Sequence, residues 1–426
     1  MRILGVGTRV YLGDLYLSLV REGHEVRAFA HDPPEQRAFG GLIEPVADWR
    51  AELPWVGRDG VVLFEGVAQG PTQDALRAEG YRVVGGSAFG DRLEKDRAFG
   101  QAILREAGLP IAAGWNFPGP DQALAWLGQH PGHYVLKWNE GVHETYVGDH
   151  PEGADVAFQL RRARARPAGL LLMERLEGVE AGVGAYFDGQ KFLRPACLDF
   201  EHKRFFPGDM GEMTGEMGTL ATYEGADRLF EATLNRVVPH LARAGHVGYV
   251  NLNLIVNERG AWPLEFTCRF GNPGFAILAA MQADGWGDLL HKMAWGGAER
   301  FRTVPGWAVC IVLTVPPFPA RRDEAVPADD PPIFFLRPPK GEDATHYRLV
   351  DARRGDDGQL VVHRRSGHAM IVTGTGPTVP AAQAAAEARA HNVVIPELRW
   401  RTDIGARYRA GEGERLRTLG WLDAGR

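Results

Sequence analysis

The chain has 426 residues, of which 45% are hydrophobic and 24% charged, values typical of a globular protein of roughly two to four domains. The formal net charge of −6 provides no general basic field, so no nucleic-acid partner is expected. The three cysteines, Cys197, Cys268 and Cys310, are far apart and form no CxxC pair, which argues against a disulfide framework or a structural zinc site.

The sequence also predicts a cytoplasmic location without a membrane partner. The chain starts directly with a strand-like run, and no basic region followed by an apolar stretch and a cleavage site marks a signal peptide. No run approaches the roughly 18 uninterrupted apolar residues of a membrane span.

The first 90 residues alternate between strand and helix patterns, which is typical of a parallel α/β sheet. The expected strands are Arg2–Val6, His24–Ala30, Val61–Phe64 and Tyr81–Val84, and a helix is expected over Leu12–Arg21. The Gly-rich segment from Gly5 to Gly13 has the position of a phosphate loop. Its spacing is not GxGxxG, so a tight strand-to-helix turn is the preferred interpretation.

The next part of the chain predicts one helix followed by several strands. The helix is expected over Asp91–Ala107 and ends before Leu109-Pro110. Strands are expected at Tyr134–Trp138, Gly169–Leu176, Gly182–Phe187, Val247–Val256 and Trp262–Thr267, the last two paired antiparallel across a turn at Asn257–Gly260.

After Pro305 the prolines cluster between Val315 and Pro339 and the pattern changes to short strands, with one helix over Ala381–Ala390. We therefore expect three domains, residues 1–90, 91–304 and 305–426, with a small lid subdomain at about 110–175 in the second.

Three segments carry residues suited to chemistry. The apolar strand that ends in Glu174, followed by Glu180, has carboxylates placed to accept from an adenine amine and ribose hydroxyls; an edge strand with solvated acids is preferred on this segment alone. The segment Leu198–Gly218 combines glycines with Asp199, Glu201 and three basic-capable residues, which suits a loop that closes over an anionic substrate.

In the third segment, Glu265 shares a strand face with Thr267 and Arg269. Such a face is costly in a core unless it is paired or metal-bound. Oxygen ligands suit Mg²⁺, and Asn251 or Asn253 on the preceding strand has the position to add one. A Glu–Arg pair is the competing interpretation and stays open.

Taken in order, these segments resemble the phosphoribosylamine–glycine ligase family (glycinamide ribonucleotide synthetase) of the ATP-grasp superfamily, over almost the whole chain. The matching stretches are Gly85–Phe99, Tyr134–Lys137, Glu174–Glu180 (E-E-F-L-x-G-x-E in the family), E-H-K-R at Glu201–Arg204 with the glycines to Gly218 (D-H-K-R…G-D-x-G…T-G-G-M-G), E-F-T-C-R-F-G-N-P at Glu265–Pro273 (E-F-N-C-R-F-G-D-P) and W-R-T-D-I-G at Trp400–Gly405.

The resemblance implies an α/β ATP-grasp fold with an N-terminal parallel α/β domain and a small C-terminal β-rich domain. It implies ATP and Mg²⁺ (or Mn²⁺) as cofactors and an acyl-phosphate mechanism. By position, the nucleotide residues are Arg97, Lys137, Glu174, Leu176 and Glu180; the metal ligands Glu265, Thr267 and Asn253; the catalytic residues Arg269, Lys203 and Arg204; and the substrate contacts His202, Asp209, Thr214, Gly215 and Asn272.

The chain departs from the family in four places. Trp138–Gly148, with Glu140, His143 and Glu144, replaces the loop G-x-A-A-G-K-G-V, and Thr267 replaces the Asn of E-F-N. Arg9–Gly13 replaces G-R-E-H-A, and Val315–Pro319 replaces G-G-Y-P-G. The last two changes affect the loops that help to hold phosphoribosylamine in the family.

We therefore expect a diverged ligase that joins glycine or another small amino acid to an amine that differs from phosphoribosylamine. The alternatives are a genuine phosphoribosylamine–glycine ligase of purine synthesis and a catalytically inactive nucleotide-binding protein. The expected partners are small molecules, and the chain is expected to be a monomer or homodimer.

Overall fold

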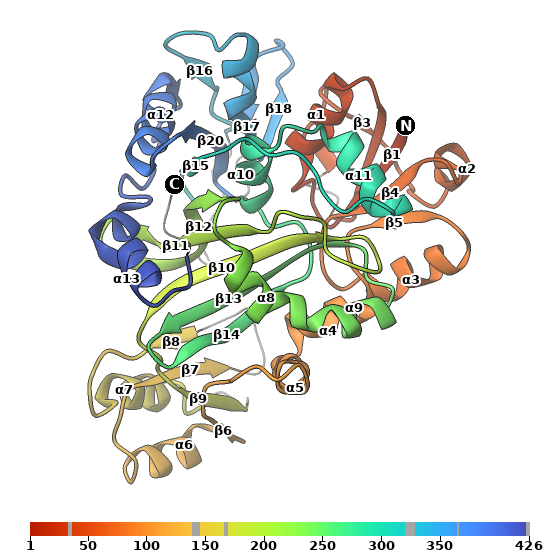
Figure 1. The fold of residues 1–426 in the computed structure, drawn as a ribbon. Coiled ribbons are helices and arrows are strands. Elements are labelled where there is room, and N and C mark those ends of the chain that lie inside the picture. Colours follow the sequence, from red (N-terminus) through yellow and green to blue (C-terminus); the bar gives the residue numbers. More distant parts are fainter. Residues whose placement is uncertain (33–35, 139–144, 166–168, 320–328, 364–365, 423–426) are drawn as a thin grey trace.

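The computed structural model describes residues 1–426 except 33–35, 139–144, 166–168, 320–328, 364–365 and 423–426. Figure 1 shows a long sheet through the middle of the molecule, with the N-terminal segment on one side, the C-terminal segment above and a smaller sheet at the bottom. No helix in the described part is long and apolar enough to cross a membrane.

The N-terminal sheet has five strands in the order β3-β2-β1-β4-β5, and every pair is parallel, as predicted. Side chains on its two faces enter two separate cores, Ile3 and Leu63 on one face and Leu4 and Val62 on the other. Burial on both faces explains the continuous apolar runs of these strands. The elements are β1 (Arg2–Gly7), α1 (Gly13–Arg21), β2 (Glu25–Ala30), β3 (Glu44–Pro45), α2 (Leu53–Val56), β4 (Val61–Phe64), α3 (Gly70–Ala78) and β5 (Arg82–Val84).

The single helix predicted over Asp91–Ala107 is wrong, because two helices are present: α4 (Ala88–Lys95) and α5 (Arg97–Glu106). Asp96 separates them with an extended backbone (φ −100°, ψ 92°), and its carboxylate caps α5 by accepting from the Phe99 N–H. Asp is a strong N-cap residue, so the local preference overrides the helical periodicity. The break makes Arg97 the first residue of α5.

The smaller sheet has four antiparallel strands in the order β6-β9-β7-β8. Its strands are β6 (Gly114–Phe117), β7 (Tyr134–Trp138), β8 (Thr145–Val147) and β9 (Leu170–Glu174), and it packs with α6 (Pro120–Leu127) and α7 (Ala154–Arg162). Leu170 and Leu172 enter the core under the helices, whereas Leu171 and Met173 lie in a second apolar cluster. The opposite face is therefore also apolar.

The central sheet has eight strands in the order β14-β13-β10-β11-β12-β15-β20-β17, and every pair is antiparallel. Its strands are β10 (Val179–Phe187), β11 (Cys197–Phe206), β12 (Met210–Thr222), β13 (Gly248–Asn257), β14 (Gly260–Thr267), β15 (Trp307–Thr314), β17 (Tyr347–Leu349) and β20 (His368–Gly376). The predicted β13–β14 hairpin is confirmed. The sheet continues past residue 305, and the domain boundaries near residues 90 and 305, like the lid at 110–175, stay a proposal.

The prediction of a loop over Leu198–Gly218 is wrong. These residues form the hairpin of β11 and β12, whose turn contains Gly208 and Asp209 with positive φ values of 71° and 54°. The reason is visible in the alternation of the segment, because Leu198 and Phe200 enter the core while Asp199 and Glu201 point to the other face. Alternation with a period of two is the pattern of a half-buried strand. The many charged residues of this segment make the alternation hard to recognise in the sequence.

The remaining helices cover the sheets. They are α8 (Asp227–Ala232), α9 (Val238–Arg243), α10 (Gly274–Met281), α11 (Trp286–Trp295), α12 (Val379–Asn392) and α13 (Gly413–Thr418), with short turns at Leu234–Val237, Gly341–His346 and Tyr408–Glu412. Two small strand pairs, β16 (Phe334–Phe335) with β21 (Val393–Val394) and β18 (Ala352–Arg354) with β19 (Leu360–Val362), complete the C-terminal part.

Candidate active site

A cavity of about 1520 Å³ lies between the smaller sheet and the central sheet. Its lining comes from β7, β8 and β9 on one side, from strands β10–β14 on the other, and from α10. It brings together all but one of the site residues predicted from the sequence, namely Arg97, Lys137, Glu174, Leu176, Glu180, Lys203, Arg204, Asp209, Thr214, Gly215, Asn253, Glu265, Thr267, Arg269 and Asn272. The exception is His202.

One end of the cavity is apolar. Val135, Met173 and Leu176 form part of one hydrophobic cluster there, and all three line the cavity. Glu174 ends β9 at this place and pairs with Arg259 at 3.2 Å. Since β9 lies between β6 and β7, the interpretation of this segment as an edge strand is wrong. We call Val135, Met173 and Leu176 the apolar slot; apolar side chains beside a carboxylate are suited to a heterocycle with an amino group.

Two cations follow the apolar slot. Lys137 on β7 is only 7% exposed, and burial, with the positive charge of Arg97 in second place, lowers the pKa of its ammonium to about 8. Burial also lowers the pKa of Arg97, which Glu265 partly offsets. Two partly desolvated cations that line one cavity form a site for anionic oxygens.

The ammonium group of Lys203 joins three carboxylates in the middle of the cavity. Its Nζ lies 3.2 Å from Glu201, 3.4 Å from Glu265 and 3.5 Å from Glu180. Burial alone would lower the pKa of Lys203, but the carboxylates, Glu201 first, raise it well above its ordinary value. Desolvation alone would raise the pKa of Glu265, but Lys203, Lys137 and Arg97 hold it below its ordinary value. Lys203 therefore stays charged and Glu265 ionised.

The oxygen donors around Glu265 fit a hard cation. The strand register places Asn253 opposite Glu265 and Asn251 opposite Thr267. Asn251 donates to Asp199 at 2.6 Å, and Asn253 donates a longer bond of 3.3 Å to Glu201. Among the described residues, no group of three or more His, Cys, Asp or Glu side chains is arranged to hold a metal ion. A Mg²⁺ ion would accordingly depend on phosphate oxygens for part of its shell, as is usual for this ion.

Arg269 lines the cavity. The competing interpretation, in which Arg269 pairs with Glu265, is wrong. The Nε of Arg269 donates to Glu94 at 3.1 Å instead. Glu94 belongs to α4, which faces β14, so this ion pair connects the helix to the end of the strand. One edge of the guanidinium group is thereby fixed in the wall of the cavity.

His202 points away from the cavity. Its Nε2 accepts from the Gly405 N–H at 3.2 Å and its Nδ1 lies 3.1 Å from the Phe200 carbonyl. Burial first, then the guanidinium groups of Arg407 and Arg401, lower its pKa to about 4. A neutral imidazole that donates at Nδ1 and accepts at Nε2 satisfies both contacts. This geometry gives His202 a structural position between the hairpin and the C-terminal segment.

Three further predicted residues brace the hairpin while lining the cavity. Arg204 donates to the Gly211 carbonyl at 2.8 Å, and Thr214 donates to the Lys203 carbonyl at 2.7 Å. Asp209 pairs with Arg401 at 2.8 Å and Arg407 at 3.1 Å. These contacts hold the hairpin that carries Lys203.

The Gly-rich segment Gly5–Gly13 lies outside this cavity. The Leu12 N–H, at the start of α1, donates to the carboxylate of Glu65 at 3.1 Å, and Tyr16 donates to the same carboxylate at 2.6 Å. A side chain therefore occupies the helix N-terminus, in keeping with the preferred interpretation as a turn. The altered loop Trp138–Gly148, with Glu140, His143 and Glu144, includes residues 139–144, which lie outside the described residues.

The sequence prediction missed several residues that line the cavity. Glu216 and Tyr249 were not named, and Asp199 and Glu201 were named only as parts of a loop expected to close over an anionic substrate. The alternation along β11 places Asp199 and Glu201 on the same face as Lys203. Glu216 stands where the family motif T-G-G-M-G has its second Gly, which was a readable signal.

The chain is similar in sequence to proteins of one family. Residues 95–275 match the family described as phosphoribosylglycinamide synthetase, ATP-grasp (A) domain. A phosphoribosylamine–glycine ligase of Streptomyces coelicolor is 29% identical over 409 residues, covering 93% of this chain and 91% of that protein. The protein of the same name from Mycobacterium tuberculosis (strain H37Rv) is 29% identical over 428 residues, with coverages of 96% and 93%.

Solved structures share the fold. The crystal structure of phosphoribosylamine–glycine ligase from Thermotoga maritima has a TM-score of 0.74 at 18% identity and covers 95% of this chain and 100% of that chain. Biotin carboxylase from Campylobacter jejuni has a TM-score of 0.64 at 10% identity, with coverages of 98% and 95%. The ATP-grasp fold predicted from the sequence is confirmed.

Proposed function

We propose that this chain, an ATP-grasp ligase that resembles phosphoribosylamine–glycine ligases, activates the carboxylate of glycine or another small amino acid and joins it to an amine. The observation that carries the proposal is the meeting, in one cavity, of the buried Lys137 and the half-buried Arg97 with Lys203 and its three carboxylates. Phosphoryl transfer requires this combination of anion-binding and charge-neutralising groups.

The nucleotide would lie along the smaller sheet. Its adenine fits the apolar slot of Met173 and Leu176, with Glu174 near the exocyclic amine and Glu180 near the ribose. The phosphates would then reach Lys137 and Arg97. We propose Glu265, Thr267 and Asn253 as the residues that hold Mg²⁺ or Mn²⁺, which would neutralise phosphate charge when bound.

The amino acid would lie beyond the phosphates, near Arg269. The guanidinium group of Arg269, fixed on one edge by Glu94, would orient the carboxylate for attack on the γ-phosphate. Lys203 and Arg204 would stabilise the charge that develops on the transferred group. The attack on the γ-phosphate forms the acyl phosphate and releases ADP. The neutral amine then attacks the acyl carbon, the C–N bond forms, the C–O bond to phosphate breaks, and the amine proton leaves with phosphate or to solvent.

The identity of the amine is the finer part of the proposal. A genuine phosphoribosylamine–glycine ligase is the second candidate, favoured by the names of the two reported relatives. Against it stand the segments Arg9–Gly13 and Val315–Pro319, which differ from the family's acceptor loops. The first of these begins a helix whose N-terminus is occupied by Glu65. We therefore propose a different amine. We also propose a cytoplasmic monomer or homodimer that acts on small molecules.

The test is ADP formation from Mg-ATP and glycine with a panel of amines that includes freshly generated phosphoribosylamine. Turnover that needs glycine and an amine other than phosphoribosylamine supports the proposal. Turnover with phosphoribosylamine alone makes the second candidate correct. Nucleotide binding without turnover on any combination indicates the inactive binding protein.

A further inference from the structure

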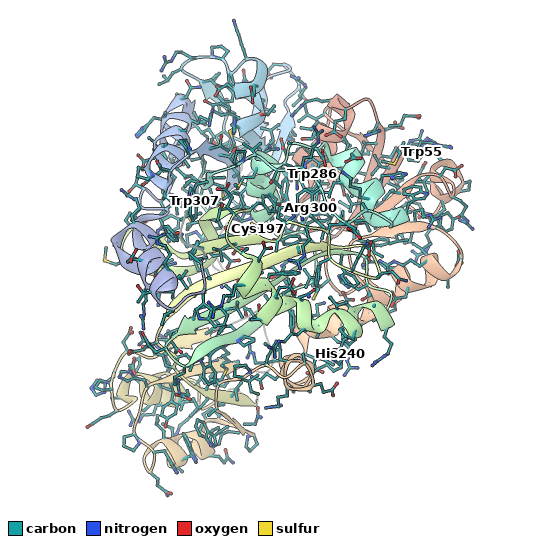
Figure 2. The ribbon with its side chains drawn as sticks, in the orientation of Figure 1. Trp55, Cys197, His240, Trp286, Arg300 and Trp307 are labelled. Carbon is teal, nitrogen blue, oxygen red and sulfur yellow. The ribbon has the colours of Figure 1, made fainter. Side chains whose placement is uncertain are left out.

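The most buried part of the cavity is lined by polar side chains that the proposed function does not use. Five of them are buried, and the sixth, Glu216, has a buried carboxylate oxygen. We call this group the acid subsite: Cys197, Asp199, Glu216, Thr219, Tyr249 and Asn251. In Figure 2, Cys197 marks its place near the centre of the molecule.

Three oxygen atoms of the acid subsite lack a hydrogen-bond partner among the described residues. They are Asp199 Oδ1, Glu216 Oε1 and Thr219 Oγ1. Asp199 is 6% exposed, and only its other oxygen is satisfied, by Asn251. Buried polar atoms are almost always hydrogen-bonded, so unpartnered acceptors that line one cavity indicate a missing donor.

Two glycines of β10 make the space for these side chains. A Cβ at Gly182 would lie 2.2 Å from Asp199 Oδ1, and a Cβ at Gly184 would lie 1.8 Å from the Tyr249 hydroxyl. Both distances are far shorter than a van der Waals contact. The sheet is therefore hollowed where Asp199 and Tyr249 extend into the cavity.

Among the described residues, neither Asp199 nor Glu216 forms an ion pair. Lys203 pairs instead with Glu180, Glu201 and Glu265, and it offsets the repulsion at the acid subsite only in part. Burial, and then the charge of Glu201, raise the pKa of the Asp199 carboxyl to about 8. Burial, Glu201 and Asp199 raise the pKa of Glu216 in the same way. A positive charge placed between Asp199 and Glu216 would remove this repulsion.

We propose that the acid subsite binds a protonated amino group of the substrate, so that the ligase acts on a diamino compound whose second ammonium group does not react. An ammonium group has three N–H donors, which equals the number of unpartnered acceptors. No group of three or more His, Cys, Asp or Glu side chains in the described chain is arranged for a metal ion, and Thr219 and Tyr249 suit N–H donors. The inference rests on the proposed function.

Glu216 distinguishes the acid subsite of this chain from the family motif. The family motif T-G-G-M-G has Gly at this position, and Gly supplies no side-chain acceptor. The variant Glu216→Gly therefore restores the motif and removes one carboxylate from the cavity. It gives a test that does not depend on a buried substitution such as Asp199→Asn.

The experiment measures the binding of two matched pairs of probes to the full chain with Mg-ADP by calorimetry. The pairs are 1,3-diaminopropane with propylamine, for the amine side, and 2,3-diaminopropionate with 2-aminobutyrate, for the amino-acid side. We expect the diamino member of one pair to bind at least about tenfold more tightly than its match, as a charged hydrogen bond predicts. The pair that shows the preference identifies which substrate carries the second ammonium group.

In each of the variants Asp199→Asn, Glu216→Gln and Glu216→Gly, the ratio of the two dissociation constants within the preferred pair should fall by about tenfold. The matched control is Glu212→Gln, which neutralises an exposed acid on the same strand β12 and should retain the wild-type ratio. A melting temperature and an ADP affinity like those of the wild type show that a variant is folded.

Equal binding within both pairs, no binding of either diamino probe, or a preference that persists in Glu216→Gly would overturn the proposal. Such results leave the proposed ligase activity standing if glycine is still activated. Diamine binding that depends on Glu216, without ATP-dependent turnover, would instead separate the subsite from the proposed function.

Discussion

The ammonium nitrogen of Lys203 lies 3.4 Å from Oε1 of Glu265. The two residues belong to β11 and β14, which β10 and β13 separate in the central sheet. Lys203 therefore reaches across the floor of the cavity, and it also pairs with Glu201 and Glu180. In the proposed function, Lys203 neutralises part of the carboxylate charge at the place where the γ-phosphate of ATP would bind.

Replacement of Lys203 by Met should lower kcat/KM of the ligase reaction by roughly 30-fold or more. The reason is that removing one group that stabilises developing charge in the transition state costs about 2.7–4 kcal/mol, and about 1.4 kcal/mol corresponds to tenfold. Lys203→Arg keeps the charge and should lose less. Wild-type kinetics in Lys203→Met would contradict a charge-balancing role.

Nucleotide affinity should fall as the pH rises through about 8. Burial and Arg97 lower the pKa of Lys137 to about 8, and only the charged ammonium attracts phosphate. The dissociation constant of ADP, measured by calorimetry between about pH 7 and pH 9.5, should rise by up to about tenfold per pH unit above that pKa. Lys137→Arg remains charged over this range, so its profile should be flatter. Parallel profiles would show that Lys137 does not contact phosphate.

The C-terminal segment should stabilise the hairpin through the ion pairs of a buried arginine. The Arg401 side chain is 0% exposed and pairs with Asp209 at 2.8 Å and with Asp403. Arg401→Met removes these pairs and leaves Asp209 with Arg407 alone, so it should lower the free energy of unfolding by about 1–3 kcal/mol. In urea denaturation, the control Arg415→Met, which removes an exposed pair with Glu258, should keep the wild-type midpoint. Equal midpoints for both variants would contradict this role of Arg401.

His246 should lower stability on acidification. Burial, and then Arg77, lower its folded-state pKa to about 3, and its Nδ1 lies 3.0 Å from Ser87 Oγ. Below a pH of about 6.5 His246 is protonated in the unfolded chain but not in the folded protein, so its contribution to the free energy of unfolding falls by about 1.4 kcal/mol per pH unit down to the folded-state pKa.

Other groups add slopes of either sign, among them His202, whose burial lowers its pKa to about 4, and Glu65, whose burial raises its pKa to about 7. The measurement therefore compares the unfolding free energies of wild type and His246→Gln at pH values of about 7, 6 and 5. Their slopes should differ by one proton, and equal slopes would contradict this role of His246.

The sequence predicted the elements whose pattern is local. Tyr134–Trp138 and Val61–Phe64 have the bounds expected, because each is a short apolar run between polar residues. The break at Asp96 was missed because a capping carboxylate competes with the periodicity of a longer helix. The hairpin over Leu198–Gly218 was missed because its charged side chains face a cavity. In the sequence, such a density of charges is like that of a surface loop.

Only those residues of the candidate site that belong to recognisable sequence motifs could be predicted. Lys137, Glu265 and Arg269 stand in recognisable stretches, and all three line the cavity. The contacts of Lys203 depend on the order of strands in the sheet, which no spacing in the sequence contains. The orientation of His202 depends on strand alternation, and for this reason the motif alone placed it on the wrong face.

We propose that this ligase makes an acyl phosphate from an amino acid. Incubation of the protein with Mg-ATP, one amino acid at a time and hydroxylamine, without any other amine, tests this step directly. We expect hydroxamate and phosphate in equal amounts with glycine or a close relative, and their loss in Lys137→Met. Phosphate release that does not depend on the amino acid, or no hydroxamate with any amino acid although ATP binds, would contradict this proposal.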